Sequence, residues 1–333
     1  MYNPLKNINK ITLALSIYTI TTFANADILT SVRPLGFIAS SIADGVTDTQ
    51  VLVPAGASPH DYSLKPSDVK RVHDTDFIVW IGEDVDAFLA KSIEKRDPKT
   101  VLTISKIDGL ASLLGETSAH DHDHDHDHDH DHDHDHDHQH SDQQHDEHNH
   151  EHADHNHNHA NELEQDWHIW FSPAISQRVA EQLAEKLTQS FPQQKDKIAA
   201  NLAEFKQQLA DKNKQINQQL VSLKDKGFYV FHDAYRYFEN AYGLKQTGYF
   251  TINPLIAPGA KKLAEIKEEI NEHKVQCLFA EPQFTPKVIE TLQHSTKVNV
   301  GQLDPMGEKI KLGKGSYTAF LQQIADAFAS CLK

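Results

Sequence analysis

A long helical tract, PQQKDKIAANLAEFKQQLADKNKQINQQLVSLKDKG at residues 192–227, decides how the rest of the chain is organised. Pro192 suits the first turn of a helix, and Gly227 is the kind of residue that closes one. Seven apolar side chains recur along one helical face: Ile198, Leu202, Phe205, Leu209, Ile216, Leu220 and Leu223. At 1.5 Å per residue the helix would extend for roughly 50 Å. Such a helix can pack inside one lobe, but its place between two α/β halves favours a rigid connection between two lobes.

Both flanking halves alternate short β-rich runs with helical patterns. Before the tract, the expected strands are residues 50–53, 77–81 and 100–104, with helices at 67–73 and 85–93. After it, the expected strands are 228–231, 275–279 and 298–303, with helices at 260–273, 286–294 and 317–332. Alternation of this kind is typical of βαβ units. The sequence therefore predicts an α/β fold: two βαβ lobes with largely parallel sheets, joined by one long helix.

The net charge of −16 is concentrated in one segment. Residues 120–159 hold 18 of the 24 histidines and 14 acidic side chains, with no Lys or Arg. Outside this segment, 34 acidic and 32 basic side chains remain. A nearly neutral body lacks the basic surface that nucleic-acid binding requires. With 38% hydrophobic residues the chain can also fill real cores, so we expect a globular protein that does not bind nucleic acid.

The histidine-rich insert, residues 120–159, has no apolar face with which to fold on its own. We expect it to be a surface loop of the first lobe. Alternating Asp and His is a metal-binding composition, because neutral imidazole binds Zn²⁺, Cu²⁺ and Ni²⁺. The alternative is a solvated repeat with no task, and metal capture is favoured over it.

The first 26 residues are typical of a secretory signal peptide. Lys6 and Lys10 precede an apolar stretch at residues 11–23, and Ala24-Asn25-Ala26 matches a small-x-small cleavage site. The apolar stretch is short for a membrane span, so an uncleaved anchor is the weaker alternative. We therefore expect export and cleavage before Asp27, with a Gram-negative periplasm as the compartment.

These features divide the chain into four parts. We expect a signal peptide at 1–26, an N-terminal metal-binding lobe at 27–171 that includes the insert, a helical linker at 172–226, and a C-terminal lobe at 227–333. The two cysteines fall in the last part. Cys277 lies in an apolar strand-like run and Cys331 near the end of the last helix. In an oxidising compartment a disulfide between them is favoured over two buried thiols.

Six histidines lie outside the insert, and three of them occupy loop positions. His60 and His232 each follow an expected strand, where open α/β sheets bind ligands, and His168 comes shortly after the insert. The other three, His73, His273 and His294, lie on or beside amphipathic helices. Three imidazoles and one further donor satisfy tetrahedral zinc, which makes His60, His168 and His232 a candidate metal site.

Five motifs make the sequence similar to a known family: GASPHDYSLKPSD (56–68), DWHIW (166–170), FHDAY (231–235), FAEPQF (279–284) and LDPMG (303–307). With its histidine-rich insert, the mature chain resembles the periplasmic zinc-binding components of bacterial high-affinity zinc ABC transporters, in the cluster A-I family of solute-binding proteins. The resemblance implies metal bound between the lobes by His60, His168 and His232. It also implies delivery to an inner-membrane permease with its cytoplasmic ATPase, and we expect a monomer.

A fourth ligand stays open. Some zinc members of the family carry Glu directly before the first histidine, where this chain has Pro59. The candidates are water, a histidine of the insert, and Asp304, since manganese members use an aspartate in the matching Asp-Pro motif. Asp304 can equally be a turn residue before Pro305.

The metal is expected to be Zn²⁺. Manganese members place a carboxylate where His232 stands, and manganese prefers oxygen ligands while imidazole suits zinc. The proposed role is a carrier, not an enzyme. Alternatives are a manganese- or nickel-type carrier, a zinc hydrolase, and a metal buffer in which only the insert acts. No His-Glu-x-x-His motif supports the hydrolase, and the buffer leaves the three loop histidines unexplained.

Overall fold

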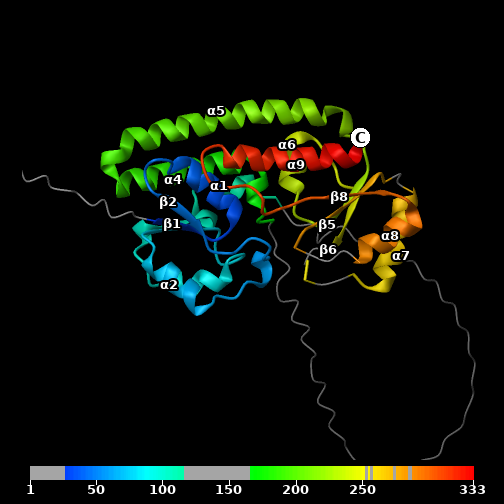
Figure 1. Cartoon of the computed structure of the whole chain (residues 1–333), viewed down its shortest axis with the longest axis horizontal. Coiled ribbons are helices and arrows are strands. Elements are labelled where there is room, and N and C mark those ends of the chain that lie inside the picture. Colours follow the sequence, from blue (N-terminus) through cyan, green and yellow to red (C-terminus); the bar gives the residue numbers. More distant parts are fainter. Residues whose placement is uncertain (1–26, 116–165, 252–253, 256–257, 273–274, 284–286) are drawn as a thin grey trace, which may run out of the picture.

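The computed structural model describes residues 27–115, 166–251, 254–255, 258–272, 275–283 and 287–333. The expected signal peptide and the expected insert lie outside these residues. Among the described residues, the structure has two sheets that repeat one topology (Figure 1). In each, the first strand of the lobe is flanked by the second and the third, and the fourth lies outside the third.

The N-terminal sheet has the order β2-β1-β3-β4, and all its strands are parallel. Its strands are β1 (Asp27–Thr30), β2 (Asp48–Val51), β3 (Phe77–Trp80) and β4 (Val101–Thr103). Every residue of β3, with the sequence FIVW, is buried, as is typical of a parallel strand covered on both faces. Two helices of this lobe are α2 (Pro66–Asp74) and α3 (Ala90–Ile93).

The C-terminal sheet has the order β6-β5-β7-β8 and is also parallel throughout. Its strands are β5 (Phe228–His232), β6 (Gly248–Thr251), β7 (Cys277–Ala280) and β8 (Asn299–Gln302). The apolar runs of β5 and β7 are fully buried. The accompanying helices are α6 (Arg236–Tyr242), α7 (Ala260–Glu272) and α8 (Lys287–Thr296). The predicted α/β fold with parallel sheets is confirmed.

A layer of four helices joins the two sheets: α1 (Arg33–Ile42), α4 (Pro173–Ser190), α5 (Lys195–Leu220) and α9 (Ser316–Leu332). In Figure 1, α5 runs along both lobes with α9 beside it. The helix α5 contacts α1, α4 and α9. Its buried Asn201 donates from Nδ2 to the carbonyl oxygens of Ile42 (2.9 Å) and Asp44 (2.8 Å), which ties it to the end of α1. The connecting helix predicted from the sequence is therefore present, with 26 residues and a length of about 39 Å.

The last helix, α9, begins beside the N-terminal lobe and ends at the C-terminal one. The ring centroid of Phe320 lies 5.6 Å from that of Phe37 on α1. The Tyr317 hydroxyl donates to the carbonyl oxygen of Trp170 at 2.9 Å. One continuous hydrophobic core consequently includes side chains from both sheets and the helices between them. This arrangement restrains hinge motion between the lobes, because closing or opening them would disturb a shared core.

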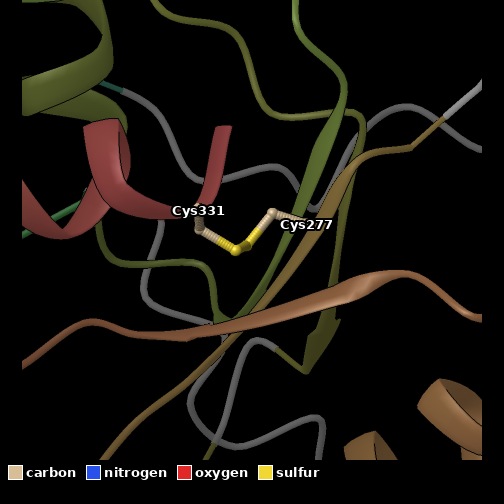
Figure 2. Close-up of a disulfide and its surroundings, with 2 residues drawn as sticks. All are labelled: Cys277 and Cys331. Carbon is tan, nitrogen blue, oxygen red and sulfur yellow. A yellow bond between two sulfur atoms is a disulfide. The ribbon is translucent and has the colours of Figure 1, made fainter. Parts of the chain in front are cut away.

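The disulfide expected from the sequence links Cys277 at the start of β7 to Cys331 near the end of α9 (Figure 2). Their Cα atoms are 5.9 Å apart, within the usual range for such bonds. The bond holds the last turn of α9 against the C-terminal sheet. It lies at the amino end of β7, while the loops that carry the histidines leave the opposite ends of the strands.

Several element boundaries differ from those predicted. The strands β1 and β6 and the helix α1 were not expected from the sequence, and the helix expected at residues 85–93 is a 3₁₀ turn at Ala87–Leu89 followed by the single turn of α3. The remaining predicted strands and helices are found within a few residues of their expected positions. None of the described helices combines the length and the apolar character needed to cross a bilayer.

Candidate metal centre

Three histidines converge at the carboxyl ends of the two sheets. His60 lies in a 3₁₀ turn, Pro59–Asp61, in the loop after β2, and its backbone N–H donates to the Ser58 hydroxyl at 3.3 Å. His168 immediately precedes a second 3₁₀ turn at Ile169–Phe171. His232 is the last residue of β5, which lies between β6 and β7. This is the point of an open parallel sheet where successive connections leave in opposite directions and ligands bind.

The three imidazole rings form a compact cluster. Their centroids are 5.6 Å apart for His60 and His168, 5.1 Å for His60 and His232, and 4.7 Å for His168 and His232. One ring nitrogen from each lies within 4.8 Å of the corresponding nitrogens of the other two. Tetrahedral zinc with Zn–N bonds of about 2.0–2.1 Å needs nitrogens about 3.3 Å apart. Small movements of side chains would therefore bring all three onto one ion.

Asp166 fixes the orientation of His168. Its Oδ1 lies 2.7 Å from His168 Nδ1 and also accepts from the His168 backbone N–H at 2.9 Å. Asp166 is itself buried, and its carbonyl oxygen accepts from the Tyr237 hydroxyl at 2.7 Å. A carboxylate on one ring nitrogen selects the tautomer that leaves the other nitrogen unprotonated, which is the usual support of a histidine ligand. The geometry thus leaves His168 Nε2 available to a metal.

The histidines share the wall of a small cavity of about 20 Å³, which is room for an ion or a water molecule. The rest of its wall consists of the following side chains: Ser58, Pro59, Trp170, Glu281, Gln283, Pro305 and Met306. Glu281 is buried, and burial raises its pKa to about 8. The cavity wall thus offers three histidine rings with nitrogen donors and three oxygen-bearing side chains, those of Ser58, Glu281 and Gln283.

Asp304 does not join the histidine cluster among the described residues. Its carboxylate instead accepts from the backbone N–H groups of Met306 (3.1 Å), Gly307 (2.9 Å) and Glu308 (2.7 Å). These bonds close the turn that follows β8. The geometry matches the turn alternative weighed for this residue, and it leaves the fourth position of the site to another donor.

Burial, and then the neighbouring His168, lower the pKa of His60 from 6.5 to about 3. The unfolded chain therefore binds a proton at this residue near pH 6.5, whereas the folded, metal-free protein does so only near pH 3. Because the unfolded state takes up more protons in this window, the metal-free protein should lose stability as the pH falls from about 6.5 toward 3.

Replacing His60 by asparagine should remove that part of the pH dependence. Urea unfolding of the metal-free protein at pH 7 and pH 5 measures it. The wild type should lose more stability between the two values than His60→Asn. His73→Asn, at a histidine whose side chain is 87% exposed, serves as the control and should behave like the wild type. Equal losses in the wild type and His60→Asn would contradict this assignment.

The residues that surround the three histidines and contact them or line their cavity were not predicted from the sequence. Asp166 belongs to a quoted motif, and its spacing of two residues before His168 was an available signal. Glu281 belongs to another quoted motif, FAEPQF, but nothing in the sequence indicates that its side chain faces the histidines. Tyr237 offers no signal at all, because its contact with Asp166 depends on how α6 packs.

Comparisons with known proteins show the family of the chain. A family described as "Zinc-uptake complex component A periplasmic" matches residues 28–331. The high-affinity zinc uptake system protein ZnuA of Haemophilus influenzae is 65% identical over 315 residues, which cover 93% of this chain and 94% of that protein. The protein of the same name from Yersinia pestis is 42% identical, over 93% of this chain and 92% of its own length.

Solved structures share the fold. A crystal structure of ZnuA covers 92% of this chain and 99% of its own, with a TM-score of 0.71 and 23% identity. A ZnuA deletion mutant with zinc bound covers 92% of this chain and 98% of its own, with a TM-score of 0.70 and 22% identity. The family match spans residues 28–331, which is most of the chain, and the two relatives match over more than nine-tenths of their own lengths. The chain therefore belongs to the family of periplasmic A components of zinc-uptake complexes.

Proposed function

We propose that this protein is the zinc-binding component of an ABC-type zinc-uptake system in the periplasm. It captures Zn²⁺ with His60, His168 and His232 and delivers it to an inner-membrane permease driven by a cytoplasmic ATPase. The observation that carries the proposal is the convergence of three imidazoles within 4.8 Å, supplied by both lobes, in a protein of this family. The protein is thus a carrier for its metal and not an enzyme.

The donor set favours zinc over manganese. Three neutral imidazoles suit Zn²⁺, whereas Mn²⁺ prefers carboxylate and water oxygens. The Asp166 carboxylate, which is bonded to the cluster, is engaged with a histidine ring and a backbone N–H. Titration of the purified protein with Zn²⁺ against a chelator of known affinity tests the function. One tightly bound Zn²⁺ per chain, not displaced by excess Mn²⁺, is the expected result, and tighter binding of Mn²⁺ would favour the manganese-type carrier.

The proposal also covers the processing of the N-terminus and the oligomeric state of the protein. Cleavage after Ala26 would leave Asp27, the first residue of β1, as the mature N-terminus. We propose that the mature protein is a monomer. The large apolar side chains that are exposed in the described part of the chain lie on separate elements and loops: Val69, Leu113, Val221, Leu255 and Val300. Scattered exposed residues of this kind do not make the continuous apolar patch of a stable dimer.

The Asp166→Asn variant should bind zinc about 10- to 100-fold more weakly than the wild type, the range found when the carboxylate partner of a ligating histidine is removed. The amide can still occupy the same volume, so the fold should be preserved. Competition titration measures the affinity, with circular dichroism as the check on folding. Asp97→Asn, at an exposed turn in the N-terminal lobe, is the matched control and should leave the affinity unchanged. Wild-type affinity in Asp166→Asn would mean that His168 does not ligate zinc through this arrangement.

We further propose that the histidine-rich insert gathers zinc for the main site. A variant lacking residues 120–159 should keep one tight Zn²⁺ and lose the additional weakly bound ions. It should also support less growth under zinc starvation. Isothermal titration resolves the two classes of site, and zinc-limited growth of a strain carrying the variant measures the effect. Equal stoichiometry and equal growth would remove the gathering role while leaving the main site intact.

A further inference from the structure

Two buried oxygen atoms on the wall of the histidine cavity have no hydrogen-bond partner in the described part of the chain. They are Oε2 of Glu281 and Oε1 of Gln283. Both residues follow directly after β7, two positions apart, and Glu281 is only 3% exposed. An unpaired buried acceptor costs about 1–3 kcal/mol, so a pair of them beside one cavity calls for a ligand that donates hydrogen bonds.

The other polar atom of each side chain is already engaged. Glu281 Oε1 accepts from the Tyr235 hydroxyl at 3.0 Å. Gln283 Nε2 donates to Glu308 Oε1 at 3.1 Å, and because a carboxylate can only accept, this contact fixes which end of the amide faces the cavity. One polar atom of each side chain is therefore held by a hydrogen bond, and the remaining oxygen is the acceptor without a partner.

A direct bond from Glu281 to the metal does not fit the geometry. The group of ligand atoms that lie within 4.8 Å of one another contains the three histidines and, among the described residues, no carboxylate. Three histidine nitrogens leave one position of a zinc tetrahedron unfilled. Pro59, Pro305 and Met306 offer no strong side-chain donor there, and the oxygens of Asp304 are bound to backbone N–H groups.

We propose that Glu281 and Gln283 hold a water molecule that completes the coordination of the metal. Such a water uses one lone pair for the metal and points two hydrogens outward. Glu281 Oε2 and Gln283 Oε1 supply two acceptors for those hydrogens. The metal makes the water a stronger donor, and its positive charge favours the ionised form of Glu281, which then accepts with charge assistance. This inference rests on the proposed zinc-binding function and adds two positioning residues to it, neither of which touches the metal.

The test compares zinc affinities of variants that remove the two acceptors. Gln283→Met removes one. Glu281→Met removes the other but would leave the Tyr235 hydroxyl without its acceptor, so it is made in a Tyr235→Phe background and compared with Tyr235→Phe alone. Each acceptor variant should bind one Zn²⁺ per chain with an affinity about 10- to 100-fold lower than its reference. Because both side chains act through one water, the loss in the combined variant should be smaller than the product of the two single losses.

Glu239→Met is the matched control. Glu239 is also buried in the C-terminal lobe with one unpaired oxygen, but it does not line the cavity. Its zinc affinity should equal that of the wild type even if the fold is less stable. Wild-type affinity in the Glu281 or Gln283 variants, or losses that multiply fully, would overturn the proposal while the zinc site itself stands. A wild-type protein that does not bind zinc tightly would instead refute the function on which it rests.

A crystal structure of the zinc-loaded protein gives the second readout. The proposal expects a water bonded to zinc and within hydrogen-bond distance of both Glu281 and Gln283. A fourth protein ligand in that position, or a water that contacts neither side chain, would contradict it.

Discussion

Replacing His232 by alanine is expected to weaken zinc binding by at least about a thousandfold. His232 is buried, and its ring lies closest to that of His168. Loss of a group that hydrogen-bonds to a metal ligand from outside the coordination sphere costs about 10- to 100-fold, and loss of a ligand itself removes a metal–nitrogen bond and must cost more. A thousandfold corresponds to about 4 kcal/mol, at 1.4 kcal/mol for each factor of ten.

Competitive titration with a zinc chelator measures this effect. The variant should retain the parallel sheet, because residue 232 is at the end of β5 and alanine makes the same backbone pairing with Thr251. A control variant and a background without the insert show whether the loss is due to His232. His73→Ala, at an exposed histidine outside the cavity, should bind zinc as the wild type does. Tight stoichiometric binding that survives in His232→Ala, measured in a background without residues 120–159, would show that the metal is held elsewhere.

Removing the disulfide should lower the free energy of unfolding by about 4 kcal/mol. The bond joins residues separated by 54 positions, and closing a loop of that size in the unfolded chain accounts for a stabilisation of this magnitude. The Cys277→Ala/Cys331→Ala variant avoids buried polar replacements, since Cys277 is fully buried and Cys331 nearly so. Urea unfolding of the metal-free protein, with and without a reductant, measures the change.

The same variant should bind zinc with wild-type affinity. The disulfide lies at the amino end of β7, whereas Glu281 and the cavity follow its carboxyl end. Reduced wild-type protein and the double alanine variant should unfold at similar urea concentrations, and zinc should stabilise both. A stability loss below about 1 kcal/mol would show that α9 is held by its packing against α1 and α5 alone.

Much of the fold could be predicted because its strongest elements have clear local patterns. The buried run of β5 and the apolar face of α5 identify a strand and a helix without any knowledge of contacts. The partner of α9 could not be predicted in this way. Its sequence shows an apolar face, but only the packing shows that the face lies on α1 of the other lobe. Short elements such as β6, which has only four residues and begins with Gly248, carry too little pattern to identify.

The residues of the site also divide into those that the sequence predicts and those that only the folded structure shows. His60, His168 and His232 could be named from their loop positions, and the structure brings those three together. The support of His168 by Asp166 depends on the conformation of the loop, and the orphaned oxygens of Glu281 and Gln283 depend on how the loop after β7 faces the cavity. Asp304 shows that a motif alone can mislead. Its carboxylate stands in a motif that suggests a metal ligand, but in the structure it accepts hydrogen bonds from three backbone N–H groups.

The most direct test of the central claim is a crystal structure of the purified mature protein loaded with one equivalent of Zn²⁺, with the metal located by its anomalous scattering. The account predicts one ion between the lobes, with a nitrogen of His60, His168 and His232 each about 2.0–2.1 Å from it. A fully occupied zinc that is bound elsewhere, or that contacts fewer than three of these histidines, would contradict the account.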